Sequence, residues 1–458
     1  MIDSRRDLLK CLMGSPLYLS MLACSECQRA PTRQGKILVI GAGMAGLSAA
    51  NALTARGFEV EVLEARARHG GRIHTISSMG VPVDMGATWI HGSRGNPVTT
   101  LSRKHGIKTL KSDEEHIILY ERPLKALDDA KLRRIHEGYK NLKKYMDEGD
   151  ATRKVSVAQA VRQGIELESL SHWEVKALEW MLSVQQVSSG VDLESMSMQF
   201  GTDDLQYPGK DLLFPGGYAQ VCDALSRGLT IRYGQVVKAI DYRLEQVKVT
   251  TNKGVFKADG VVVTLPLGVL QAKAVTFLPR LSSKKRDAIA QLKMGLLNKV
   301  VLSFDRIFWS KHYQFLGHLK GARGAFPAFL NMAAFSKQNA PVLVGFLGGQ
   351  YAARLEKEGE RAMYEQAIAA LRAMFGNGIP KPTRFAVTRW GMDPYSFGSY
   401  SHVPVGSTSA YYDEMAKPIH DKVFFAGEAT SRLWRSTVHG AWHSGERVSK
   451  QVVRLLRV

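Results

Sequence analysis

Short apolar runs alternate with a helical pattern where the body of the chain begins. Residues 36–40 form a β-rich apolar run, residues 47–56 are rich in alanine with helical spacing, and residues 58–63 return as a strand that ends in Glu64. Gly57 separates the helix from the second strand. This order predicts a βαβ unit, the building block of a parallel sheet covered by helices.

A glycine-rich turn joins the first strand to the helix. Gly41 permits a tight turn, Gly43 lets the backbone approach a pyrophosphate, and Gly46 lets the helix and strand pack closely. The start of the helix offers N–H groups to phosphates, and Glu64 can accept hydrogen bonds from ribose hydroxyls. The turn therefore predicts a dinucleotide site, without choosing between NAD and FAD.

Three further patterns predict elements later in the chain. Residues 247–256 indicate a hairpin with its turn at 251–254. Residues Val300, Leu302 and Phe304 alternate, which predicts a strand with Lys299 at its start. A helix is expected from apolar residues at helical spacing: Met363, Ala367, Leu371 and Phe375.

The chain of 458 residues carries a formal net charge of +20, and its basic residues are spread along it. The densest run is Lys131, Arg133, Arg134, Lys140, Lys143 and Lys144. The apolar residues around this run fall at helical spacing: Leu124, Leu127, Ile135, Tyr139, Leu142 and Met146. We therefore interpret the run as the solvated face of an amphipathic helix. The sequence shows no zinc-finger or helix-turn-helix signature, so a nucleic-acid partner is not expected.

The first 30 residues are typical of an export signal. Arg5 and Arg6 stand in a stretch that resembles the twin-arginine motif, and a mildly apolar stretch follows from residue 11 to 23. As a helix it would rise only about 20 Å, too little for a bilayer core of about 30 Å. Residues 21–24 resemble a lipoprotein box. We expect residues 1–30 to direct export to a bacterial periplasm, with a membrane tether where Cys24 is lipidated. An ordinary basic leader or an unstructured N-terminus is the alternative.

The cysteines give no sign of a disulfide framework. Cys11, Cys24 and Cys27 precede the first strand, which leaves Cys222 alone in the body. Folding in a reducing compartment before export would suit such a chain.

Several motifs in order carry a family resemblance. Residues 70–75, 84–92, 215–218, 265–270, 390–400, 424–430 and 437–441 are similar to segments of the flavin-containing amine oxidases, and residues 84–92 resemble the polyamine and spermine oxidase branch. The resemblance runs from about residue 35 to about 450. It implies an α/β fold in which a Rossmann-like FAD-binding lobe (33–100, 212–300 and 385–458) is interleaved with an α+β substrate-binding lobe (101–211 and 301–384).

The resemblance also implies a set of residues that bind FAD. Glu64 and Arg66 would hold the adenosine ribose, Arg72 the pyrophosphate or flavin, and Glu428 the ribityl chain. Backbone groups of Val237 and Val438 would meet adenine and the flavin pyrimidine edge. The full set is Gly41, Gly43, Met44, Ala45, Gly46, Glu64, Arg66, Gly71, Arg72, Gly86, Ala87, Thr88, Val237, Gly427, Glu428, Thr437 and Val438. Ser399 stands where monoamine oxidases have a flavin-linked cysteine, which implies FAD held without a covalent bond.

Five residues are implied in the chemistry: Lys299, Tyr400, Thr437, His91 and Trp390. In the family the lysine bonds a water at flavin N5, where a cation favours charge on the reduced ring. Tyr400 would be one wall of an aromatic cage, in the stretch from Trp390 that lines the flavin's reacting face. Thr437, in place of a second cage tyrosine, implies a more open site. A neutral His91 could accept a hydrogen bond from an amine, and a structural histidine is the alternative.

The expected function is oxidation of an amine, with hydride transfer from carbon to flavin N5, hydrolysis of the imine, and reoxidation by dioxygen to give hydrogen peroxide. The substrate would be a polyamine or another primary or secondary amine, and the chain a monomer or homodimer without a metal. An L-amino-acid oxidase, a flavin monooxygenase and a non-catalytic flavin-binding protein are the alternatives. Because a charge of +20 repels polycations, spermine-like substrates would need an acidic mouth. Asp203 and Asp204 could meet a distal ammonium, although a solvated loop is favoured.

Overall fold

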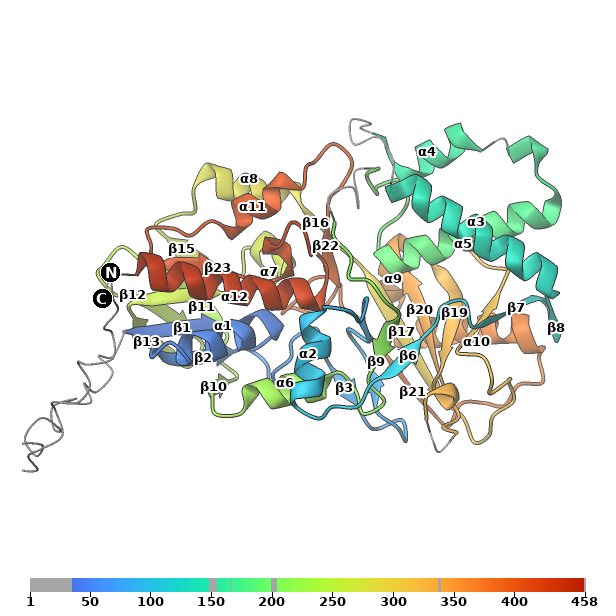
Figure 1. Ribbon diagram of the computed structural model, residues 1–458, viewed down its shortest axis with the longest axis horizontal. Helices are drawn as coiled ribbons and strands as arrows, with labels where there is room; N and C mark the ends of the chain where they lie inside the picture. The colour runs from blue at the N-terminus through green and yellow to red at the C-terminus, as the bar shows by residue number, and fades with distance from the viewer. Residues whose placement is uncertain (1–34, 148–154, 166, 199–203, 337–338, 457–458) are drawn as a thin grey trace, which may run out of the picture.

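The computed structural model describes residues 35–147, 155–165, 167–198, 204–336 and 339–456. The expected leader with Cys24, and Asp203, lie outside the described residues. Two halves are seen in Figure 1, one around the first strands of the chain and the other around a large second sheet. No helix within the described ranges is both long and apolar enough to cross a membrane.

The first half is built on a parallel sheet of five strands, in the order β10-β2-β1-β14-β23. The strands are β10 (Thr230–Tyr233), β2 (Glu59–Glu64), β1 (Lys36–Ile40), β14 (Gly260–Val263) and β23 (Val423–Phe425). Parallel strands need crossover connections that cover the sheet, and α1 (Met44–Thr54) is the first of them. The βαβ unit expected from the sequence is therefore present, in a doubly wound arrangement.

Both faces of this sheet are buried. In β1, Ile37 and Val39 pack into the cluster that contains α1 and α12 (Val438–Leu455), while Leu38 and Ile40 pack into a second cluster. That second cluster includes residues of a smaller sheet and of three short helices. They are β13 (Gly254–Ala258), β12 (Val247–Thr251), β11 (Val237–Asp241), β15 (Thr276–Leu278), α7 (Leu267–Gln271), α8 (Ser283–Gln291) and α11 (Ala410–Ala416). The hairpin expected at 247–256 is β12–β13.

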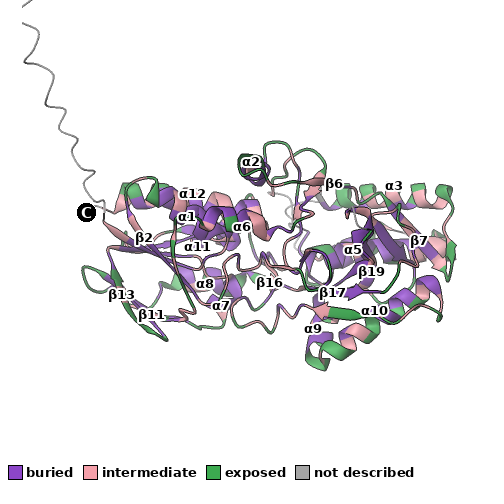
Figure 2. Ribbon diagram, turned by 90° about the horizontal axis from the view of Figure 1, so that it is seen from below, coloured by how far each residue is buried: buried purple, intermediate pink, exposed green. Residues whose placement is uncertain are grey.

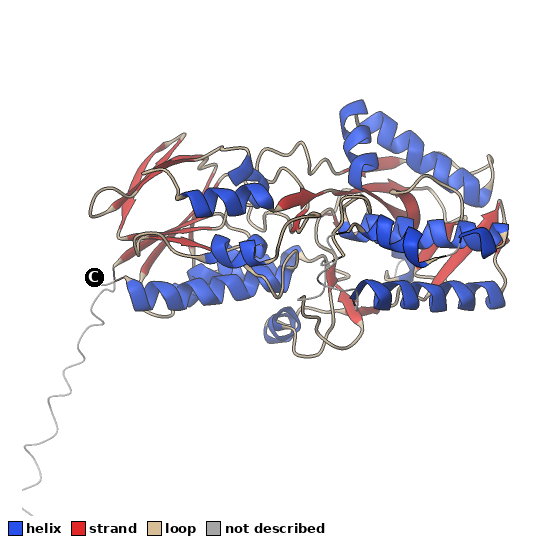
Figure 3. Ribbon diagram, turned by 90° about the horizontal axis from the view of Figure 1, so that it is seen from above, coloured by secondary structure: helices blue, strands red, loops and turns tan. Residues whose placement is uncertain are grey.

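The second half is built on a sheet of seven strands, antiparallel except where β18 pairs with β7. In sheet order the strands are β21 (Arg384–Val387), β17 (Leu297–Ser303), β20 (Val342–Gly348), β19 (Ala325–Asn331), β18 (Phe315–His318), β7 (Ile117–Arg122) and β8 (Lys125–Ala126). Helices lie on both sides of it (Figure 3), and buried residues gather in the strands of both halves (Figure 2).

Each face of the seven-stranded sheet packs on its own helices. Val301 belongs to the cluster of α5 (His172–Ser189), whereas Val300 and Leu302 belong to that of α10 (Glu360–Phe375). The expected helix with Met363 is α10. The remaining helices of this half are α3 (Asp129–Asp147), α4 (Val157–Gly164), η1 (Leu167–Ser169), η2 (Met332–Ala334) and α9 (Gly349–Glu358).

Short elements lie in and between the two halves. They comprise β3 (Thr75–Ile76), β4 (Val83–Asp84), β5 (Trp89–Ile90), β6 (Leu110–Ser112), β9 (Asp211–Leu213), β16 (Lys293–Gly295), β22 (Tyr400–His402), α2 (Pro97–Lys104), α6 (Ala219–Ser226) and η3 (Glu428–Thr430). In a three-stranded sheet, β9 pairs with both β5 and β6. Strands β16 and β22 form a separate two-stranded sheet.

Three details differ from the sequence-based expectations. The lobe boundaries at 300 and 385 cut through β17 and β21, because both strands pair within the seven-stranded sheet. The basic helix begins at Asp129, and Leu124 is 76% exposed in the turn between β7 and β8. The strand with Lys299 begins at Leu297, so Lys299 lies inside it.

Gly46 is the point of closest packing between α1 and the turn before it. A Cβ on Gly46 would lie 1.9 Å from the carbonyl oxygen of Gly41, whereas a Cβ on Gly378 would meet nothing within 4 Å. We expect Gly46→Ala to lower stability by about 1–3 kcal/mol or more, because the clash outweighs alanine's helix preference. The measurement is the midpoint of thermal unfolding, with Gly378→Ala as control. A Gly46→Ala protein that melts at the wild-type temperature would contradict this packing.

Candidate functional site

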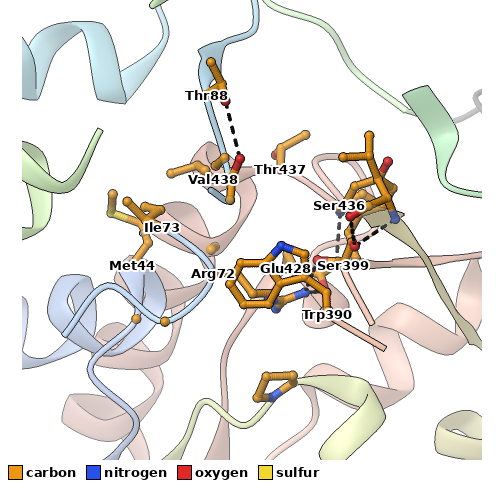
Figure 4. A pocket seen from close by; sticks show the side chains of 18 of the residues that line it. Met44, Arg72, Ile73, Thr88, Trp390, Ser399, Glu428, Ser436, Thr437 and Val438 are labelled. Carbon is orange, nitrogen blue, oxygen red and sulfur yellow. Dashed lines mark hydrogen bonds and ion pairs between the residues drawn. The ribbon is translucent and has the colours of Figure 1, made fainter. Parts of the chain in front are cut away.

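A cavity of about 860 Å³ extends from the glycine-rich turn to residues of the seven-stranded sheet. Every residue of the expected site lines it except Gly46, which packs behind the turn. Lining residues therefore include Gly41, Gly43, Met44, Ala45, Glu64, Arg66, Gly71, Arg72, Gly86, Ala87, Thr88, His91, Val237, Lys299, Trp390, Tyr400, Gly427, Glu428, Thr437 and Val438. Figure 4 shows Met44 and Ile73 on one side of the view, Ser399 and Ser436 on the other, and Trp390 between them. Residues more than 350 positions apart in the chain meet in this cavity.

The dinucleotide end is shaped by the turn before α1. Gly41 has φ +100, a left-handed conformation that favours glycine. Glu64, at the end of β2, accepts hydrogen bonds from the N–H groups of Ala42 (2.7 Å) and Arg66 (2.8 Å). Because Gly43 is the N-cap of α1 and brings no side chain, the start of the helix faces the cavity with backbone alone. This arrangement suits a bound phosphate.

A partly buried ion pair lines the cofactor end of the cavity. The Arg72 guanidinium donates to Glu428 Oε1 and to the carbonyl oxygen of Ser399, both at 2.9 Å. The other oxygen of Glu428 accepts from Ser401 Oγ (2.6 Å) and from the N–H of Ser436 (3.1 Å). Glu428 is only 5% exposed, and these donors supply the hydrogen bonds that its buried carboxylate oxygens need.

Lys299 reaches the cavity from β17 in the other half. Its ammonium donates to the carbonyl oxygens of Asp84 (2.7 Å) and Gly86 (2.6 Å) and to Thr88 Oγ1 (2.6 Å). Burial lowers the pKa of Lys299 to about 8, while the charge of Asp84 opposes this shift. Burial raises the pKa of Asp84 to about 6, against the hydrogen bond from Thr75 and the charge of Lys299. At neutral pH a positive charge therefore lines the cavity.

A hydrogen-bonded network fixes the strand that carries Lys299. Thr388 Oγ1 accepts from the N–H of Lys299 (2.8 Å) and donates to Asn298 Oδ1 (3.0 Å), which also accepts from the N–H of Trp390 (3.1 Å). The Trp390 indole N–H donates to the carbonyl oxygen of Met85 at 3.2 Å. The indole and the lysine thus hold the same segment, residues 84–88, from two directions.

Tyr400 and Thr437 both line the cavity, each with a defined partner. The Tyr400 hydroxyl donates to the carbonyl oxygen of Ser188 in α5 at 2.6 Å, and burial raises its pKa well above the ordinary value. Thr437 is the N-cap of α12, where its hydroxyl oxygen accepts from the N–H of Gly440 at 2.9 Å. A threonine here both caps the helix and leaves space that a tyrosine ring would fill.

His91 has a partner that the sequence did not indicate. Its Nδ1 lies 2.7 Å from Oδ2 of Asp211, the first residue of β9. Burial works to lower the pKa of His91, but the hydrogen bond and charge of Asp211 outweigh it, and the net pKa is raised. The carboxylate of Asp211 therefore stabilises the protonated ring of His91 relative to a free histidine. The role of a neutral His91 as a hydrogen-bond acceptor for an amine stays a prediction.

Several residues of the site escaped the sequence analysis. The partners of Lys299 include two backbone carbonyls, which carry no side-chain signal. Glu114, Glu115, Lys140 and Lys143 also line the cavity. The two lysines lie on the exposed face of α3, as the sequence predicts, and this face borders the cavity. Asp204 is not among the lining residues. No group of three or more His, Cys, Asp or Glu able to hold a metal occurs in the parts of the chain that the structure describes.

The comparisons with known proteins agree with this geometry. Residues 44–453 match the model of the family described as flavin containing amine oxidoreductase. The chain belongs to this family. It is 35% identical to polyamine oxidase 2 of Arabidopsis thaliana over 92% of this chain and 88% of that protein. It is 33% identical to lysine-specific histone demethylase 1 homolog 1 of Oryza sativa subsp. japonica over 97% of this chain and 55% of that protein.

The fold has a solved counterpart. A redesigned putrescine oxidase superposes with a TM-score of 0.76, at 17% identity, over 92% of this chain and 99% of the other. The α/β fold class, the family and the FAD cofactor expected from the sequence are confirmed, and the protein is an FAD-dependent amine oxidoreductase. The chain spans about half the length of the demethylase relative, 55%.

The flavin attachment can be checked directly. The hydroxyl of Ser399 bonds the backbone of Leu297 in both directions (2.8 and 2.9 Å), and the buried Cys222 does not line the cavity. Because a hydroxyl at Ser399 offers no thioether link, we expect acid precipitation to leave all flavin absorbance in the supernatant. Flavin that stays with the pellet after washing would show a covalent bond elsewhere.

Proposed function

We propose that this enzyme oxidises an amine at the carbon next to nitrogen and passes the electrons to dioxygen. The observation that carries the proposal is the Lys299 ammonium, buried in the same cavity as the dinucleotide turn. Buried charges at such positions are characteristic of functional sites.

The reaction balances with the cofactor, water and dioxygen. Bound FAD, which Glu64, Arg72 and Glu428 would help to hold, would supply a two-electron acceptor for the amine, with dioxygen as the final oxidant. Water hydrolyses the resulting iminium, so that the amine, water and dioxygen give a carbonyl compound, an amine or ammonia, and hydrogen peroxide.

The chain's own residues orient the substrate and supply charge. Lys299 is fixed by three hydrogen bonds, so its ammonium stabilises negative charge nearby without reorganisation. Tyr400 and Trp390 present aromatic walls whose orientations are set by their hydrogen bonds. An amine held against such walls is positioned for reaction and shielded from water.

The described residues favour an amine over an amino acid. An amino-acid oxidase would clamp the carboxylate with an arginine. The arginines that line the cavity within the described ranges are Arg66 and Arg72. Arg66 pairs with Asp393 at 2.9 Å, and Arg72 pairs with Glu428 at the cofactor end. Neither is available to a substrate carboxylate. A non-catalytic role does not explain why Lys299 and Tyr400 both line the cavity.

Replacing Lys299 tests the proposed role of its charge. We expect Lys299→Met to slow reoxidation of the dithionite-reduced enzyme by dioxygen by on the order of 10- to 100-fold, because a preorganised charge is lost. Stopped-flow absorbance of the flavin is the measurement. The control is Lys293→Met, an exposed lysine in β16 whose ammonium bonds the carbonyl oxygen of Ala290. Equal rates in the two variants would remove Lys299 from the mechanism.

The same measurement has an expected pH dependence. The pKa of Lys299 is lowered to about 8, so its positive charge is present below that pH and lost above it. Wild-type reoxidation should therefore slow as pH rises through about 8. The Lys299→Met variant should be slow at every pH, without this transition. A wild-type profile that is flat between pH 7 and 9 would contradict the assignment.

A further inference from the structure

A continuous aromatic wall leads away from Lys299. Phe346 lies opposite Lys299 across the β17–β20 ladder, with its ring centroid 5.7 Å from the ammonium. The ring of Trp89 packs against Phe346 at 5.8 Å and against Phe315 at 6.4 Å. Phe315 in turn pairs with Ile117, at the start of β7. All of these residues line the cavity. The wall that runs from Lys299 to Ile117, the first residue of β7, is therefore built from apolar side chains.

Ionisable residues lie at the other end of this wall, and they form three acid–base pairs. Glu115 pairs with Lys140 at 2.9 Å, Glu114 with Lys143 at 3.6 Å, and Asp211 with His91 at 2.7 Å. We call these six residues the mouth. The hydrogen bond from Lys140 lowers the pKa of Glu115, which keeps that carboxylate charged and paired. Each of the two glutamates that line the cavity here is thus paired with a lysine, so these two pairs carry no net charge.

No other lining carboxylate within the described ranges is open to a substrate. The remaining two are Glu64 and Glu428. Glu64 accepts backbone N–H groups at the dinucleotide turn, and Glu428 pairs with Arg72. Both lie at the cofactor end, so a second ammonium on a substrate would meet no unpaired carboxylate along the aromatic wall.

We propose that the substrate is a monoamine with an apolar aliphatic or aromatic body, and that Lys140 and Lys143 select against diamines and polyamines. This inference rests on the proposed function, because it names the amine that the same cavity takes. The amine end would lie near Lys299 and the apolar body along Trp89 and Phe315. Along the aromatic wall a distal ammonium would give up its hydration shell without meeting an unpaired carboxylate, and contact with a ring face returns only part of that cost. At the mouth the same ammonium would be repelled by the two lysines.

The first test compares amines that differ only in the distal charge. Hexylamine and hexamethylenediamine share one carbon chain, but the diamine carries a second ammonium. We expect wild-type kcat/KM to be at least about 10-fold higher for hexylamine, measured as peroxide release under air. Hexylamine should also bind more tightly than the diamine. Its lower Kd is read from the initial change of flavin absorbance on anaerobic mixing. Spermine should be poorer than hexylamine in both measurements.

The second test removes the selecting charges. In Lys140→Met/Lys143→Met, Glu115 and Glu114 lose their partners, so the mouth becomes acidic. We expect the ratio of kcat/KM for the diamine to kcat/KM for hexylamine to rise about 3- to 10-fold. The control is Lys125→Met, a lysine paired with Glu121 at 3.9 Å that does not line the cavity. It should leave the ratio unchanged.

The outcomes separate this inference from the proposed function. A wild-type preference for hexamethylenediamine or spermine, or an unchanged ratio in the double variant, would overturn the inference while peroxide release still supports amine oxidation. Amines that bind in the expected order without reducing the flavin would support the inference and overturn the proposed function. Equal thermal midpoints and flavin contents show that the variants compared are folded.

Discussion

The ammonium of Lys299 is the point on which the two halves of the molecule depend. It projects from β17 and bonds two carbonyl oxygens and one hydroxyl of residues 84–88, which precede β5. An ammonium has three N–H donors, and here each has a partner. These three hydrogen bonds therefore fix the position of a charge inside the cavity. The same bonds join the seven-stranded sheet to residues 84–88 at the cofactor end.

The surrounding network protects this arrangement from distortion. Asn298 accepts from Thr388 and Trp390 and donates to Glu356 at 2.6 Å, so the strand beside Lys299 is held by buried polar bonds. Buried polar networks are costly when only partly satisfied. A substitution in this group would consequently move the lysine as well as weaken the fold. The position of Lys299 and the stability of the fold are coupled because they depend on the same hydrogen bonds.

The sequence predicted the parts of the site that depend on local geometry. The strand at 36–40 and the role of Gly46 follow from steric rules that act over a few residues, and both are present. The partners of Lys299 could not be predicted, because any residue carries a carbonyl group. The mouth could not be predicted either, since Glu114 and Lys143 are 29 positions apart and meet only when α3 packs beside the β6–β7 turn. Burial on both faces of β17 likewise depends on which helices cover the sheet.

The cofactor site depends on local sequence, whereas the substrate region depends on contacts between distant residues. Family membership therefore defines the cofactor more tightly than the substrate. Phosphates and ribose need a turn, a helix start and a carboxylate at fixed separations, and one short βαβ segment contains all three. A substrate that lies along Trp89 and Phe315 instead meets residues from several strands and helices, whose charges depend on how surface positions pair. One exchanged lysine at the mouth changes the local charge while leaving the fold and the flavin site intact. Selectivity among amines can therefore vary between relatives that share every cofactor motif.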